Sequence, residues 1–165
     1  MREKLKRERY KSSIFNLEFV IQEQRLLAVS FGAIKDDELK RLLRYDHEDC
    51  GKGDPELFPT LLDIYAKGKD PHFDTALRMY GTPFQIAVWK ACMQIPFGQT
   101  RSYRELAAMA GYPRAVRAVG TALSKNPLPL IVPCHRVICS NGSSGAFTGG
   151  ADLKIALINH EKGLT

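Results

Sequence analysis

A cysteine and a histidine stand side by side at Cys134 and His135, after an apolar stretch bounded by prolines (NPLPLIVPCHRVICSNG). A thiol is a poor nucleophile until it loses its proton. A neighbouring imidazole that accepts this proton, directly or through water, favours the thiolate, and the positive charge of Arg136 would do the same. The pattern therefore predicts a nucleophilic cysteine, Cys134, with His135 as its base.

This chemistry needs a particular backbone and a third group. Successive side chains of a strand point to opposite faces, so the two residues can cooperate only if the chain turns there, and Pro133 favours such a turn. An imidazole base also needs a group that orients it. A helix expected over 152–161 ends in His160 and Glu161, either of which could fill this role. The expected apolar stripe of this helix comprises Leu153, Ala156 and Leu157.

Two other interpretations of this cysteine and histidine stay open at this point. Cys134, His135 and Cys139 could ligate a metal, but structural zinc normally takes four ligands and no second pair lies at standard spacing. Alternatively, Cys134 could be an inert buried thiol beside a surface histidine. The surrounding sequence favours the catalytic hypothesis, and we expect no metal site.

Three helices are expected to precede and position this segment. Thr82 as N-cap and Pro83 at the first helical position open the first helix. Ser102 and Glu105 form a capping box that starts the second, and the third is expected over 114–124. The expected buried face of the first helix comprises Phe84, Ala87, Val88, Ala91 and Cys92. The last two helices match a helix-turn-helix, a pattern that also joins ordinary packed helices.

The third helix is unusually slim. Its small residues are Ala115, Ala118, Gly120 and Ala122, and its cations are Arg114 and Arg117. A slim helix can press close to a groove of a nucleic acid. The alternative is close packing against another helix, with Arg117 simply solvated.

The composition favours a polyanionic partner such as nucleic acid, because 24 Lys and Arg against 18 Asp and Glu give a net charge of +6. Part of the excess lies in the first eleven residues, which we expect to form a solvated, mobile tail. No stretch approaches the roughly 20 apolar residues that span a bilayer, and the N-terminus does not suit a signal peptide. We therefore expect a cytoplasmic protein that binds no membrane and holds its four cysteines as free thiols.

The first eighty residues predict a small α/β unit. Alternating apolar residues over 15–21 and 27–31, separated by the polar QEQR, indicate a β-hairpin. Helical spacing indicates helices over 36–45 and 55–67, with a glycine-rich turn (CGKGDP) between them, and a short strand is possible over 73–79. This unit contains no recognisable catalytic cluster, and we interpret it as a scaffold.

Several of these motifs together resemble one family. PCHRV, preceded by Asn126-Pro127 and followed by SNG, Gly149-Gly150, Lys154 and Glu161, closely resembles the active-site region of the O6-alkylguanine-DNA alkyltransferases. FQIAVWKACMQIPFGQTRSYRELA and RAVG match the same family upstream, so that the resemblance covers 82–161. It implies an α+β fold with a ribonuclease-H-like α/β domain (1–80) and a mainly helical, winged-helix-like domain with a helix-turn-helix (81–165).

The resemblance also implies roles for individual residues. Cys134 matches the alkyl-accepting cysteine, His135 its water-linked base and Glu161 the carboxylate that orients that histidine. Asn126 matches the asparagine that supports the active-site turn, and Tyr103 the tyrosine that assists base flipping and interacts with guanine. The residues assigned to the base pocket are Leu123, Pro129, Val137, Phe147 and Thr148. The residues assigned to DNA are Tyr103, Arg114, Ala115, Arg117, Ala118, Gly120 and Ser140, with Arg117 entering the base stack and the slim helix entering the minor groove.

The implied activity is irreversible, stoichiometric transfer of an alkyl group from O6-alkylguanine, and from O4-alkylthymine, in double-stranded DNA to Cys134, by a monomer without a cofactor. The sequence departs from the commonest family pattern at Phe147, where tyrosine is frequent, and at Thr148, where serine is frequent. The zinc-binding N-terminal cysteines of some animal members are absent. Two alternatives stay open: a lesion-binding or regulatory helix-turn-helix protein without transfer, and a cysteine hydrolase that uses Cys134, His135 and Glu161.

Overall fold

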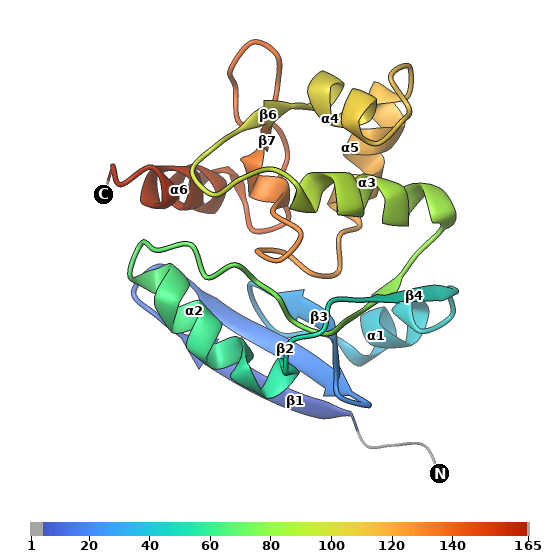
Figure 1. The fold of residues 1–165 in the computed structure, drawn as a ribbon, viewed down its shortest axis with the longest axis vertical. Helices are drawn as coiled ribbons and strands as arrows, with labels where there is room; N and C mark the ends of the chain where they lie inside the picture. Colours follow the sequence, from blue (N-terminus) through green and yellow to red (C-terminus); the bar gives the residue numbers. More distant parts are fainter. Residues whose placement is uncertain (1–4, 165) are drawn as a thin grey trace. The chain divides into compact units, whose positions relative to one another are not determined.

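The computed structural model describes residues 5–164, and the chain divides into two compact units, residues 1–82 and 83–165 (Figure 1). The first unit is built on a five-stranded sheet with the order β1-β2-β3-β5-β4. Its strands are β1 (Lys6–Lys11), β2 (Asn16–Gln22), β3 (Arg25–Ser30), β4 (His47–Cys50) and β5 (Leu77–Tyr80). All neighbours pair antiparallel except β3 and β5, which run parallel. The predicted hairpin is confirmed as β2 and β3.

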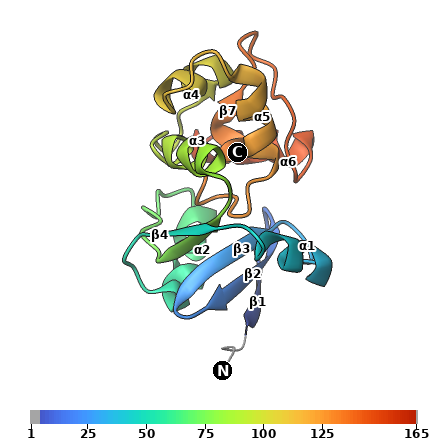
Figure 2. The same ribbon diagram turned by 90° about the vertical axis from the view of Figure 1, so that its right-hand side faces the viewer.

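Helices cover both faces of this sheet (Figure 2). They are α1 (Asp36–Leu42) and α2 (Phe58–Ala66), the latter preceded by a 3-10 turn, Pro55–Leu57. Because neighbouring residues of a strand point to opposite faces, Phe19 packs edge-on against Phe58 of α2 while Val20 clusters with Leu39 of α1. The central strands are therefore buried on both faces, whereas simple alternation would leave one face in water.

The mobile tail expected for the first eleven residues is wrong where the structure describes them, since Lys6–Lys11 pairs with β2 along its whole length. Its cations find carboxylates: Arg7 and Arg9 donate to the buried Glu18. A charged strand can pair because an edge position leaves its side chains near water. Residues 1–4 of the expected tail lie outside the described part of the chain.

The strand expected over 73–79 is observed as β5, which is shorter and begins later in the sequence. The strand β4 was not predicted. The sequence of β4, HEDC, lacks an apolar alternation because this strand is the other edge of the sheet. Two ion pairs hold it: Asp49 binds Arg78 of β5 at 2.8 Å and Arg25 of β3 at 2.9 Å. Such pairing is invisible to a search for apolar periodicity.

The second unit is mainly helical. Its elements are α3 (Pro83–Met93), α4 (Tyr103–Met109), α5 (Val116–Ser124), a 3-10 turn, Cys134–Arg136, α6 (Ala151–Glu161), and a short parallel pair, β6 (Arg101–Ser102) with β7 (Val137–Ile138). Helix α5 packs against α3 and α4, and the indole of Trp89 donates a 2.9 Å hydrogen bond to the carbonyl of Ala122. None of the helices formed by residues 5–164 is both long and apolar enough to cross a membrane.

The predicted capping box is confirmed, with Glu105 N–H donating to Ser102 Oγ and Ser102 N–H to the Glu105 carboxylate. Two details of the helix predictions are wrong. Of the five positions predicted to be buried in α3, Phe84 and Ala87 are only half-buried and the other three are buried. The helix also buries Ile86 and Trp89, which were not predicted. Helix α5 begins at Val116, so Arg114 and Ala115 precede it as a turn after Pro113, whose ring favours a turn.

Candidate active site

The backbone turns at the cysteine and histidine. Cys134, His135 and Arg136 form a single 3-10 turn, closed by a 2.9 Å hydrogen bond from Arg136 N–H to the carbonyl of Pro133. The three side chains are buried, with exposures of 7%, 1% and 7%. The turn therefore frees the two neighbouring side chains from the opposed directions of a strand.

Asn126 ties this turn to the segment that precedes it. Its side-chain amide donates to the carbonyl of Val132 at 2.9 Å and to Cys134 Sγ at 3.2 Å, and its carbonyl accepts from Leu128 N–H at 2.9 Å. Burial raises the pKa of the Cys134 thiol, and the hydrogen bond from Asn126 opposes this increase. Asn126 thus fixes the position of the sulfur and favours its thiolate.

His135 lies against a buried carboxylate. Its Nε2 is 2.5 Å from Oε1 of Glu161. Burial acts to raise the pKa of Glu161, but hydrogen bonds from His135 and Arg136 outweigh it and lower the pKa to about 2. An ionised Glu161 requires the proton on Nε2, which leaves Nδ1 of a neutral imidazole as a proton acceptor. Burial also lowers the pKa of His135, so the imidazole is neutral at pH 7 and can act as a base.

The guanidinium of Arg136 contacts Glu161 instead of the thiol of Cys134. Its guanidinium donates to both oxygens of Glu161, at 2.8 and 3.1 Å, and to the carbonyl of Ile95 at 2.7 Å. The backbone N–H of Gly98 adds a fourth bond to Glu161, at 3.1 Å. The charge of Arg136 therefore neutralises Glu161, and the expectation that it stabilises the thiolate of Cys134 is wrong. A bidentate carboxylate is the better geometric match for a guanidinium.

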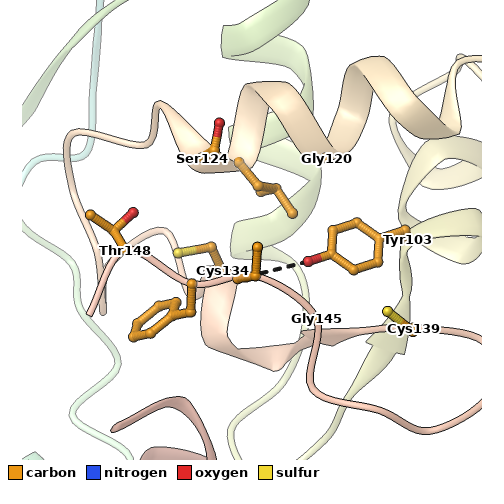
Figure 3. A pocket seen from close by; sticks show the side chains of 10 residues that line it. Tyr103, Gly120, Ser124, Cys134, Cys139, Gly145 and Thr148 are labelled. Carbon is orange, nitrogen blue, oxygen red and sulfur yellow. Dashed lines mark hydrogen bonds between the residues drawn. The ribbon is translucent and has the colours of Figure 1, made fainter. Parts of the chain in front are cut away.

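Cys134 opens onto a pocket of about 440 Å³ (Figure 3). Its walls come from Tyr103, Gly120, Leu123, Ser124, Cys134, Cys139 and residues 145–148. The two thiols lie at opposite sides of the pocket, and the hydroxyl of Tyr103 points between them (Figure 3). That hydroxyl is 3.5 Å from the carbonyl of Ala146. Burial raises the pKa of Tyr103, so its hydroxyl keeps its proton at neutral pH and can donate.

The predicted base-pocket residues divide into two groups. Leu123, Phe147 and Thr148 line the pocket together with Cys134, and the Phe147 ring meets His135 edge-on at 6.5 Å between centroids. Pro129 and Val137 are buried and do not line it. Val137 instead begins β7, where it pairs with β6.

The residues predicted to contact DNA lie on or near α5. Arg117 and Ala118 are exposed on this helix, and Gly120 faces the pocket beside Tyr103. Arg114 is exposed and Ala115 half-buried in the preceding turn, while Ser140 is exposed after β7. One face of α5 is thus open to solvent directly beside the pocket.

Lys154 was counted among the residues that carry the family resemblance, but no role was predicted for it. The apolar stripe expected for α6 is wrong: Leu153 and Ala156 are only half-buried, whereas Lys154 is fully buried with Leu157 and Glu161. The three buried residues follow helical spacing, so the register of Glu161 would have indicated Lys154. Its Nζ lies 3.4 Å from the carbonyl of Ala146 and 5.7 Å from the centre of the Tyr103 ring.

The four cysteines are free thiols, and Cys92 is buried as predicted. Within residues 5–164 no cluster of three or more His, Cys, Asp or Glu side chains has the geometry of a metal site. The sequence left open whether His160 or Glu161 orients the imidazole of His135. Glu161 is the residue in contact with it. Thiol, neutral imidazole and carboxylate together can deprotonate and hold a sulfur nucleophile.

Comparisons with known proteins agree on one family. The family model for the 6-O-methylguanine DNA methyltransferase DNA-binding domain matches residues 83–163. A methylated-DNA–protein-cysteine methyltransferase of Methanosarcina barkeri is 48% identical over 101 residues, and the inducible one of Bacillus subtilis is 45% identical over 111. These alignments cover 61% and 66% of this chain, and the chain spans only 64% and 62% of the two relatives.

Solved structures extend the likeness to nearly the whole chain. The O6-methylguanine methyltransferase of Mycobacterium tuberculosis is 33% identical and has a TM-score of 0.81, covering 98% of this chain and 95% of its own. The Pyrococcus kodakaraensis O6-methylguanine-DNA methyltransferase, at 20% identity and a TM-score of 0.64, shares the mixed α/β fold over 96% of this chain and 99% of its own. This chain therefore belongs to the family of the methylated-DNA–protein-cysteine methyltransferases, the O6-alkylguanine-DNA alkyltransferases.

Proposed function

We propose that this protein repairs DNA by moving the alkyl group of O6-alkylguanine, and of O4-alkylthymine, onto Cys134. The observation that carries the proposal is a pair of contacts in adjacent residues of one turn, Asn126 to the sulfur of Cys134 and Glu161 to the imidazole of His135, with Cys134 at the wall of a pocket of about 440 Å³. The family membership supports it, because the relatives are named for this chemistry.

The reaction is a displacement at carbon. The Cys134 thiol passes its proton to His135, directly or through water, and the thiolate attacks the alkyl carbon. A sulfur–carbon bond forms while the carbon–O6 bond breaks, and the electron pair stays with the base. Tyr103, whose hydroxyl remains protonated, offsets the developing charge, and the base takes up one proton to leave as guanine. Net transfer is one alkyl group to sulfur and one proton to the base, so no cofactor is needed.

Each molecule reacts once under this proposal. The product is a thioether at Cys134, which has no good leaving group, so the sulfur does not return to a thiol. The pocket provides a place for an extruded base rather than for a base inside the duplex. Flipping a nucleotide costs a few kcal/mol of stacking and pairing, which contacts in the pocket and at the helix must offset.

DNA binding is assigned to the helix-turn-helix of α4 and α5. A Mycobacterium tuberculosis relative, 33% identical with a TM-score of 0.76, is described in complex with DNA. We assign the open face of α5 to the minor groove, with Arg117 filling the position of the flipped nucleotide, and its neighbours Ala118 and Gly120 allowing close approach. In this proposal a monomer acts on double-stranded DNA, with residues 1–80 as a ribonuclease-H-like scaffold and 81–165 as a winged-helix-like reactive domain.

Intact-mass spectrometry tests the proposal directly. The protein is incubated with a duplex that contains O6-methylguanine, and we expect a gain of about 14 Da, one methylene, at Cys134. Cys134→Ser should gain nothing, and Cys139→Ser, which changes the other thiol of the pocket, should still gain the mass. Tight binding to the lesion without any mass change would contradict transfer and favour a lesion-binding protein. Turnover of an ester or amide without DNA would favour a hydrolase.

A further inference from the structure

Lys154 is a buried cation that pairs with no carboxylate among the described residues, 5–164. Its side chain has 0% exposure, and within residues 5–164 the polar atom it contacts is the carbonyl of Ala146. Burying an ammonium group costs several kcal/mol unless opposite charge compensates it. The other buried cation nearby, Arg136, has Glu161 for this purpose, at 2.8 Å. A buried lysine kept without such a partner needs another source of negative charge.

The position of Lys154 indicates that source. Its ammonium group lies 5.7 Å from the centre of the Tyr103 ring and 3.4 Å from the carbonyl of Ala146, which also faces the Tyr103 hydroxyl. Tyr103 and Ala146 are both walls of the pocket onto which Cys134 opens. Helix α6 thus brings an ammonium group directly behind the wall of the thiol pocket.

The other ionisable groups near Lys154 supply no negative charge to compensate it, which leaves a thiolate as the source. Tyr103 on α4 keeps its proton, and His135 is neutral because of its burial. Arg136 and Glu161 satisfy each other. The remaining ionisable neighbours are three thiols: Cys92 on α3, Cys134 in the 3-10 turn and Cys139 after β7. Of these, Cys92 is fully buried in the core, and its burial raises its pKa well above the ordinary value.

We propose that Lys154 is the counter-ion of the Cys134 thiolate, acting across the wall of the pocket as a positioning residue for the alkyl transfer. The inference rests on the proposed function of Cys134 as the alkyl acceptor. It assigns to a residue twenty positions away the electrostatic role that the neighbouring Arg136 does not fill.

The electrostatics of the two groups agree with this pairing. Burial raises the pKa of Cys134, and the charge of Lys154 is among the groups that oppose this increase. Burial lowers the pKa of Lys154, and the three thiols oppose that decrease, Cys134 most of all. Each group therefore favours the charged form of the other, as two coupled sites must.

A structural role for Lys154, as a support for the Ala146 carbonyl, predicts a different result from a counter-ion role. The pH dependence of the reaction of Cys134 with iodoacetamide separates the two, because this small electrophile reports the thiolate without any need for DNA. Rates are measured at Cys134 by peptide mass spectrometry from about pH 5 to about pH 10. The variants are Lys154→Met, which keeps the size without the charge, Lys154→Arg, which keeps the charge, and Lys162→Met, an exposed lysine just after α6.

We expect Lys154→Met to move the midpoint of the pH–rate profile upward by about one unit, which slows the reaction about tenfold at pH 7. Lys154→Arg should restore most of the rate, and Lys162→Met should match the unmodified protein. An unchanged midpoint in folded Lys154→Met would overturn the proposal, even if the rate fell at every pH.

A second measurement covers the case in which Lys154→Met does not fold. The titration of Lys154 is followed by NMR of the protein labelled with ¹³C-lysine, with and without Cys134→Ser. A serine carries no charge, so Lys154 should lose its proton at lower pH in this variant. Equal titration curves would refute the pairing.

The outcome for the proposed function is read separately from the O6-methylguanine duplex. If Lys154→Met shifts the midpoint but the unmodified protein does not take up the methyl group, alkyl transfer fails and the ion pair stands. If it takes up the methyl group and Lys154→Met leaves the midpoint unchanged, the ion pair fails and alkyl transfer stands.

Discussion

Replacement of Glu161 by glutamine should destabilise the protein in a way that depends on pH. Four donors converge on this carboxylate: Nε2 of His135, two guanidinium nitrogens of Arg136 and the N–H of Gly98. An amide can accept only at one of its two ends, and it leaves the charge of Arg136 buried and uncompensated. Removing one partner of a buried ion pair typically costs about 3–5 kcal/mol.

The pKa of Glu161 leads independently to the free energy that its carboxylate contributes to stability. Its folded value, about 2, lies below the ordinary value of 4.5. A lowered pKa means that the unfolded chain binds the proton first, so the stabilisation is complete above pH 4.5 and is lost as the pH falls towards 2. A shift of this size corresponds to about 3 kcal/mol, in agreement with the first figure. His135 adds to the loss in acid, since its lowered pKa makes the unfolded chain take a proton first below pH 6.5.

Urea unfolding at several pH values measures both effects. At pH 7 Glu161→Gln should unfold with about 3 kcal/mol less free energy than the unmodified protein, and the difference should shrink as the pH falls below 4.5. Asp152→Asn, which changes an exposed carboxylate at the start of the same helix, serves as the control and should have little effect. A difference between Glu161→Gln and the unmodified protein that is equally large at pH 7 and at pH 3 would refute the argument from charge.

Three further predictions, one of them with a matched control variant, test other parts of the site. Gly145→Ala should weaken binding of the lesion-containing duplex and cost about 1–2 kcal/mol of stability, because its φ is +69° and a Cβ would lie 2.9 Å from the Tyr103 hydroxyl; equal binding and unfolding curves would contradict this. The matched change Gly120→Ala meets Tyr103 only at 3.8 Å and should not lower the stability in the same unfolding assay. Arg117→Ala should slow methyl transfer from duplex DNA while leaving the reaction of Cys134 with iodoacetamide unchanged, since it is exposed on α5; slowing of both reactions would point to a folding defect instead. Methylation of Cys134, which is 7% exposed within a packed turn, should lower the melting temperature in calorimetry, and equal temperatures before and after reaction would refute the expected strain.

The parts of the site that local chemistry determines could be predicted from the sequence. The capping box of α4 depends on two residues three positions apart, and both of its hydrogen bonds are present. The turn after Pro133 was expected because Cys134 and His135 could not otherwise cooperate, and it is present as a single 3-10 turn. Each of these features needs only neighbours along the chain.

Features that depend on the opposite side of a fold could not be predicted in this way. The edge strand β1 has no apolar alternation, and it pairs because Arg7 and Arg9 meet the buried Glu18 across the sheet. The β4 strand depends likewise on Arg78, about thirty residues later in the chain. In both cases the carboxylate and the cation become neighbours only after the sheet has formed, so periodicity gives no signal.

The same distinction explains why the sequence suggested Arg136, and not Lys154, as the cation that favours the thiolate of Cys134. Arg136 follows Cys134 by two residues, and proximity along the chain suggested that its charge favours the thiolate. In the fold its planar guanidinium faces the end of α6, where Glu161 accepts two bonds from it, while Lys154, two turns earlier on α6, lies behind the pocket wall. A guanidinium suits a bidentate carboxylate, whereas the compact ammonium group of Lys154 lies against the single carbonyl of Ala146 in the pocket wall. Charge at the nucleophile is thus governed by the register of the last helix rather than by the residues next to the cysteine.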